Sequence, residues 1–131
     1  MRGWMMLAVV AGLVGCASWE EAARQDAFET TTQAYARALE WSDFAGIGKF
    51  VSPSPAGAAF SPESYRDFKV TSYQPGAPRA SADGRTVHRS AVIGYVRMSR
   101  MVEQSVAVQE EWVYSDTQKR WVLQDGLPVF K

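Results

Sequence analysis

The sequence has few of the residues that build metal sites and nucleophilic active sites. Its 131 residues include one cysteine, Cys16, and one histidine, His88. One cysteine excludes a disulfide within the chain, and a histidine so far along the sequence offers Cys16 no catalytic partner. No closely spaced oxygen ligands accompany His88, which we expect on a solvated strand. The sequence therefore predicts neither a metal site nor a cofactor.

The chain also has no surplus of charge and no hydrophobic run long enough to cross a membrane. Lys and Arg number 14, as do Asp and Glu, and the basic residues are scattered rather than gathered in the stripe that nucleic-acid binding requires. The uncharged run over residues 4–14 is shorter than the roughly 20 residues of a spanning helix. Nucleic acid is therefore not an expected partner.

That run has the surroundings of a bacterial export signal. Arg2 precedes it and small residues follow it, which is the order of a secretory signal peptide. The segment Leu13-Val14-Gly15-Cys16 resembles the bacterial lipobox, in which the cysteine thiol is alkylated with diacylglycerol before cleavage. The resemblance implies that residues 1–15 are a lipoprotein signal peptide and that Cys16 is the lipidated first residue of the mature chain. A buried structural thiol is the alternative, but the end of an export segment is an unusual place for one.

A lipid at Cys16 would decide where the protein resides. Two or more acyl chains anchor a protein stably to a membrane, so we expect an anchored protein of the cell envelope. Ala17 stands where an aspartate typically marks retention in the inner membrane. The resemblance therefore implies the periplasmic face of the outer membrane if the organism is diderm.

The predicted mature chain, residues 16–131, has the length of a single domain that folds without disulfides. Residues 18–39 contain no Gly or Pro and predict a long amphipathic helix, whose inward positions are Phe28, Thr31, Tyr35, Ala38 and Leu39. A short helix is expected next, with Ser42 or Asp43 as its N-cap. One helical turn is expected at residues 61–63.

After that turn the sequence changes to strand patterns. Segments rich in β-branched and aromatic residues alternate with turn signals, at residues 65–73, 86–98, 101–114 and 120–124. Asp83-Gly84 supplies a hairpin turn before the second segment. In the third segment an apolar face that includes Trp112 is interrupted by Glu110. We predict four strands in an antiparallel meander.

The order of a long helix, a short helix and a curved antiparallel sheet resembles the cystatin-like cone, whose largest group is the nuclear-transport-factor-2-like superfamily. The segment from Glu111 to Phe130 is similar to the ending of small uncharacterised envelope lipoproteins with that fold. The resemblance implies an α+β cone with the long helix packed in the concave face of the sheet. The chain lacks the early strand pair of larger members, which implies a shallow cone.

Two functions follow from this resemblance. The leading one is a noncatalytic envelope module that binds a protein partner or an apolar small ligand, with a homodimer through an apolar patch on the sheet as a further expectation. The alternative is a small enzyme like ketosteroid isomerase or the polyketide cyclases, which place an acid and tyrosines in the cone. The candidate pocket residues are Tyr35, Tyr95, Glu110, Trp112 and Trp121, and Asp43 is a second candidate acid.

The same residues have a structural interpretation. Trp112 and Trp121 would be core partners on neighbouring strands, and Tyr35 would pack the helix on the sheet. Glu110 would then face solvent or pair with an arginine. Because a fold alone does not establish chemistry, the sequence assigns no catalytic residue.

Overall fold

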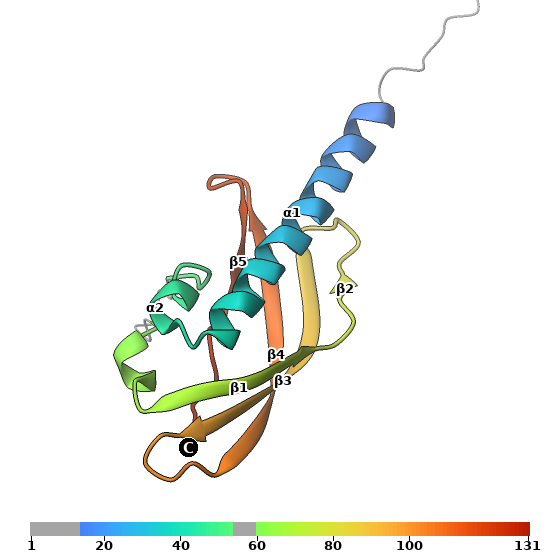
Figure 1. Ribbon diagram of the computed structural model, residues 1–131. Coiled ribbons are helices and arrows are strands. Elements are labelled where there is room, and N and C mark those ends of the chain that lie inside the picture. Colours follow the sequence, from blue (N-terminus) through green and yellow to red (C-terminus); the bar gives the residue numbers. More distant parts are fainter. Residues whose placement is uncertain (1–13, 54–59) are drawn as a thin grey trace, which may run out of the picture.

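The computed structural model of the chain describes residues 14–53 and 60–131 (Figure 1). Most of the predicted signal peptide, residues 1–13, lies outside the described residues, and so does the side chain of Cys16. The lipobox therefore stays a prediction. Within the described residues, no helix combines the length and the apolar character needed to cross a membrane.

Helix α1 (Val14–Glu40) is the longest element and begins four residues before the predicted start, at residue 18. Its first turns project beyond the sheet, and the rest lies across the sheet's concave face (Figure 1). The buried positions recur every three or four residues, as they do in a helix with one inward face; they are Phe28, Thr32, Tyr35 and Leu39. Thr32, rather than the predicted Thr31, is buried, and its hydroxyl donates to the Phe28 carbonyl at 2.9 Å.

Two short helical segments follow. Helix α2 (Phe44–Ile47) is capped by Asp43, whose Oδ1 accepts from the Gly46 amide at 2.9 Å. Ser42 is not the cap, because its hydroxyl accepts from the Val70 amide and ties this corner to the sheet. The predicted single turn is the 3-10 helix η1 (Pro62–Tyr65).

The sheet is antiparallel in the order β1-β3-β4-β5. These strands are β1 (Phe68–Pro75), β3 (Thr86–Arg97), β4 (Glu103–Ser115) and β5 (Arg120–Leu123). The four-strand meander is confirmed, with one addition. The two-residue strand β2 (Arg79–Ala80) pairs with β3, so the predicted Asp83-Gly84 turn joins β2 to β3. Gly84 has a φ of +69° there, a conformation that glycine adopts without strain.

Curvature of this sheet creates the cone. The register of β1 against β3 shifts between Val70 and Ser72, and such a bulge increases the local twist. Val51 adds a parallel bridge to Leu123 in β5. The concave face and the inward face of α1 enclose an aromatic-rich core. The predicted α+β class, with a long helix packed in a curled antiparallel sheet, is confirmed.

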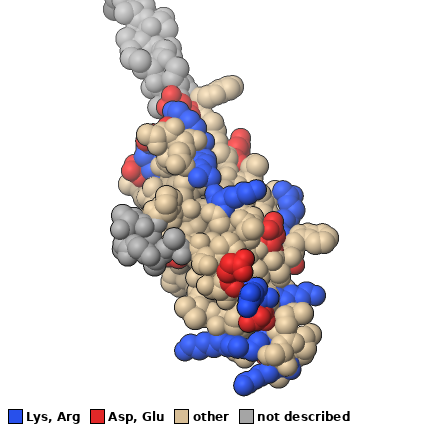
Figure 2. Space-filling view, turned by 90° about the vertical axis from the view of Figure 1, so that its left-hand side faces the viewer, with Lys and Arg blue, Asp and Glu red and all other residues tan. Residues whose placement is uncertain are grey.

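The outer face of the sheet is mostly polar. Val92 is the one exposed large hydrophobic residue on the described strands. Three others, Met98, Met101 and Val102, lie on the β3–β4 hairpin instead. Figure 2 shows the left-hand side of the view in Figure 1, where acidic and basic side chains lie among uncharged ones. The homodimer through the sheet stays a prediction, and among the described strands the outer face of the sheet offers it one exposed large hydrophobic residue, Val92.

Candidate functional site

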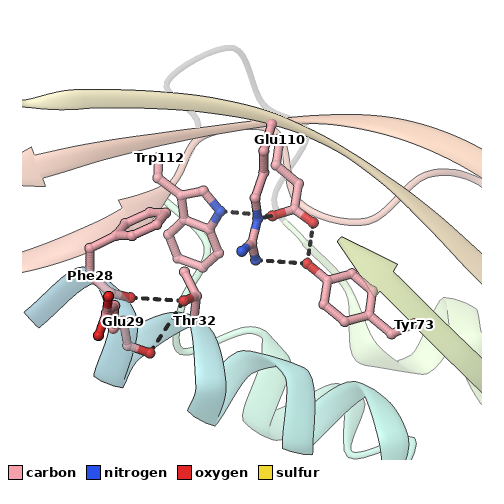
Figure 3. A network of polar contacts seen from close by, with 7 residues as sticks. Phe28, Glu29, Thr32, Tyr73, Glu110 and Trp112 are labelled. Atoms are coloured by element: carbon pink, nitrogen blue, oxygen red, sulfur yellow. Dashed lines mark hydrogen bonds and ion pairs between the residues drawn. The ribbon is translucent and has the colours of Figure 1, made fainter. Parts of the chain in front are cut away.

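The most unusual side chain of the interior is Glu110, a carboxylate that is only 4% exposed. Its Oε1 accepts hydrogen bonds from Arg89 Nε at 2.9 Å and from Trp112 Nε1 at 2.8 Å. Its Oε2 accepts a short hydrogen bond from the Tyr73 hydroxyl. Figure 3 shows Tyr73 and Trp112 pointing to the carboxylate from two sides. Both carboxylate oxygens are therefore bonded to protein donors.

Strand register brings these four side chains together. Arg89 on β3 is the direct cross-strand partner of Glu110 on β4, and paired residues of antiparallel strands project to the same face. Trp112 lies two residues after Glu110 and so shares its face. Tyr73 comes from β1, and its hydroxyl accepts from Arg89 Nη2 at 2.8 Å. We call this set, Tyr73, Arg89, Glu110 and Trp112, the Glu110 network.

The surroundings of Tyr73 in the network, and of Tyr35 beside it, keep both phenols protonated. Burial raises the pKa of Tyr73, and the neighbouring Glu110 carboxylate raises it further, while Arg89 opposes the shift. Burial also raises the pKa of Tyr35, again with help from Glu110. The phenol of Tyr73 therefore remains a hydrogen-bond donor to Glu110, and the charge of that carboxylate is balanced by Arg89.

Aromatic side chains fill the space below the network. Trp112 is fully buried. Its ring meets Tyr35 edge-on at 5.2 Å, and Phe28 meets Trp121 at 5.1 Å between ring centroids. Trp121 Nε1 donates to the Arg24 carbonyl at 2.8 Å and so ties β5 to α1. Three of the candidate pocket residues, Tyr35, Trp112 and Trp121, are thus core partners beside Glu110.

The other two candidates lie elsewhere. Tyr95 stacks on Phe130 with 4.2 Å between ring centroids, and its hydroxyl donates to Gln104 at 3.1 Å. Asp43 caps α2. His88 is exposed on β3, as expected. The structure therefore does not assemble Tyr95 or Asp43 with Glu110.

Sequence reasoning missed two members of the network, Arg89 and Tyr73. Arg89 occupies a position in the alternating series with Val87, Ala91 and Ile93, all of which are buried. That period-2 pattern was the available signal, because a charged residue within an inward series requires a partner. Tyr73 had no such signal, since its place depends on how β1 pairs with β3.

A cavity of about 390 Å³ opens between α1 and the hairpin that joins β2 to β3. Residues from four elements line it, among them Glu21, Phe28 and Glu29 of α1, Ala80 of β2, Val87 and Arg89 of β3, and Trp121 of β5. We call it the α1–hairpin cavity. It has apolar walls, acidic side chains on the helix side, and one edge of the Glu110 network at its surface.

A second cavity, of about 410 Å³, lies at η1 and the C-terminal segment. Tyr65 lines it, but the Tyr65 hydroxyl already donates to the carbonyls of Leu127 and Pro128. This cavity therefore lacks a buried polar group that is free for a ligand.

Comparisons with known proteins find a distant structural similarity. No protein-family model matches the sequence, and no curated protein matches it significantly. Among solved structures, the chain is similar to a candidate polyketide cyclase from Xanthomonas campestris pv. campestris. The match covers 77% of this chain and 90% of that chain at 17% identity, with a TM-score of 0.46. A likeness of this size transfers no site residue.

Proposed function

We propose that this chain is a lipid-anchored, noncatalytic binding module of the bacterial cell envelope. The observation that carries the noncatalytic part is the Glu110 network. A general base must reach its substrate within hydrogen-bonding distance, but both oxygens of Glu110 are bonded to Arg89, Tyr73 and Trp112. Glu110 therefore does not supply the free acid that the isomerase or cyclase alternative requires, and the rings of Trp112 and Tyr35 pack beside it.

The anchor rests on the lipobox and is consistent with the shape of α1. Residues 18–27 are largely exposed, and burial begins at Phe28. From Glu21 onward the helix contacts the rest of the domain, at the α1–hairpin cavity and through the hydrogen bond from Trp121 to the Arg24 carbonyl. A lipid on Cys16 would therefore tether the domain through the exposed turn that precedes Glu21. In a diderm host this proposal puts the domain on the periplasmic side of the outer membrane.

The binding part of the proposal rests on the α1–hairpin cavity. Ligand sites are commonly concave and mostly apolar, with a few placed polar groups. Phe28, Val87 and Trp121 supply apolar walls here, while Glu21 and Arg89 supply polar groups. A protein partner or a small ligand would bind in this cavity without undergoing a reaction.

Intact-mass spectrometry tests the anchor. Protein purified from membranes of the native host is compared with the Cys16→Ser variant, and Ala17→Ser serves as the matched control because it leaves the thiol in place. We expect a mass that starts at Cys16 and includes acyl chains in the wild type and in Ala17→Ser, but not in Cys16→Ser. An unlipidated Cys16 in wild-type protein would overturn the anchored function.

A further inference from the structure

Arg89 has one guanidinium nitrogen that the described residues leave without a hydrogen bond. Its Nε donates to Glu110 and its Nη2 donates to Tyr73, whereas Nη1 has no acceptor in residues 14–53 and 60–131. The side chain is 8% exposed and lines the α1–hairpin cavity. Among the described residues, Arg24 Nε is the one buried side-chain nitrogen or oxygen without a partner, so Arg89 Nη1 is open to the cavity. A ligand acceptor would replace water at this nitrogen.

The charge around this donor favours a neutral acceptor. Glu110 already balances the charge of Arg89 through their ion pair. A second carboxylate in the cavity would add an uncompensated negative charge in a partly buried place, which is costly. A carbonyl oxygen would accept from Nη1 without that cost.

The walls beside the donor are apolar. Phe28 and Val87 line the cavity, and the Arg89 guanidinium carbon lies 5.8 Å from the Phe28 ring centroid. A volume of about 390 Å³ is sufficient for one large side chain such as phenylalanine. The apolar group of a ligand would therefore lie next to its carbonyl.

The helix side of the cavity is acidic. Glu21 and Glu29 both line it and are exposed. Neither carboxylate forms an ion pair with any residue of the described ranges, where the two ion pairs are Arg85 with Asp116 and Arg89 with Glu110. Carboxylates on one wall of a cavity raise the local concentration of cations there.

We propose that the α1–hairpin cavity binds a basic peptide segment of a partner protein that carries one large apolar side chain. The peptide carbonyl accepts from Arg89 Nη1, the apolar side chain packs on Phe28 and Val87, and flanking Lys or Arg side chains pair with Glu21 and Glu29. This inference rests on the proposed binding function and names the ligand of that function.

A set of three matched peptides tests the ligand class. Acetyl-Lys-Phe-Lys-amide carries all three features, acetyl-Glu-Phe-Glu-amide reverses the charge, and acetyl-Lys-Ala-Lys-amide removes the apolar side chain. The full chain with Cys16→Ser is titrated with each, and the nitrogen-15 signals of the Trp121 indole and of Arg89 Nε report binding next to the cavity. We expect saturable shifts of both signals with the first peptide and weaker binding of the other two.

A pair of double variants tests the entrance. Glu21→Gln with Glu29→Gln removes the two acids that line the cavity. Glu20→Gln with Asp26→Asn removes two exposed acids of the same helix that do not line it. We expect the first pair to weaken binding of acetyl-Lys-Phe-Lys-amide about fivefold, which is the effect of two exposed ion pairs. The second pair changes the net charge equally and is expected to have no more than a small effect.

The outcomes separate this inference from the function on which it rests. Equal binding of the basic and acidic peptides, or equal loss in both double variants, would overturn the basic-peptide assignment and leave a binding module intact. Shifts with none of the peptides would overturn the assignment too. The anchored function has a separate test, the intact-mass measurement, and an unlipidated Cys16 would overturn it.

Discussion

Arg89 and Glu110 face each other across β3 and β4, 2.9 Å apart from Nε to Oε1, and both side chains are more than nine-tenths buried. Such a pair contributes little net stability compared with an apolar pair, because both ions lose their hydration. Removing one member of the pair is strongly destabilising, because the remaining buried charge then has no partner. The network is therefore vulnerable to loss of one member.

Replacing Arg89 by Met should destabilise the protein by about 3–5 kcal/mol, because Glu110 would remain buried and unpaired. Adding Glu110→Gln should restore more than half of that loss, since the amide still accepts from Trp112 and carries no charge. Urea unfolding followed by tryptophan fluorescence measures both effects. A loss of less than about 1 kcal/mol in Arg89→Met would contradict a buried pair.

Trp112 and Trp41 form a matched comparison. Trp112 is fully buried and bonded to Glu110, whereas Trp41 is 82% exposed. Trp112→Ala should cost about 3–5 kcal/mol because it leaves a large cavity in the core. Trp41→Ala should change the unfolding free energy by no more than about 0.5 kcal/mol. Similar losses of unfolding free energy in the two variants would mean that Trp112 is not packed in the core.

The raised pKa of Tyr73 predicts a loss of stability at high pH. The unfolded chain loses its phenol protons near about pH 10, while burial and Glu110 hold the folded pKa of Tyr73 higher. The stabilising contribution is complete below the unfolded pKa and is lost as the pH rises above it. The urea midpoint should fall between pH 9 and about pH 11. The fall should be shallower in Tyr73→Phe, and equal slopes would count against the burial of this phenol.

The ion pair between Arg85 and Asp116 predicts a loss of stability at low pH. A hydrogen bond from the Arg85 side chain lowers the pKa of Asp116. A lowered folded pKa gives stability that is present above the unfolded pKa, about pH 4, and is lost as the pH falls through the folded value. Asp116→Asn should therefore lower the thermal midpoint at neutral pH. The difference from wild type should vanish at about pH 2, and its persistence there would show that the aspartate acts through packing instead.

The sequence predicted the elements that depend on local pattern. The spacing of Phe28, Tyr35 and Leu39 predicts the inward face of α1, and β-branched segments predict the four long strands. The two-residue strand β2 is too short to produce any pattern. Helix α1 begins at Val14 although Gly15 is a poor helix former, which the local pattern does not predict.

The candidate site was predictable only in part. Alternation along β4 puts Glu110 on the face of Trp112, and pairing with an arginine was one of the expected arrangements. Which arginine it meets depends on the register of β3 and β4, since Arg89 and Glu110 lie 21 residues apart. Tyr73 is 37 residues from Glu110, so its contact depends on the pairing of a third strand. Single residues carry no information about such long-range register.

The central claim is that Glu110 belongs to a closed structural network rather than to an open catalytic pocket. Hydrogen exchange of the Trp112 indole N–H, followed by NMR on the full chain with Cys16→Ser, tests it directly. The account predicts that this proton exchanges no faster than the most protected core amides, because exposing the fully buried Trp112 requires global unfolding. Exchange at the rate of an exposed side chain would show that water reaches the bond between Trp112 and Glu110, and it would contradict the noncatalytic account.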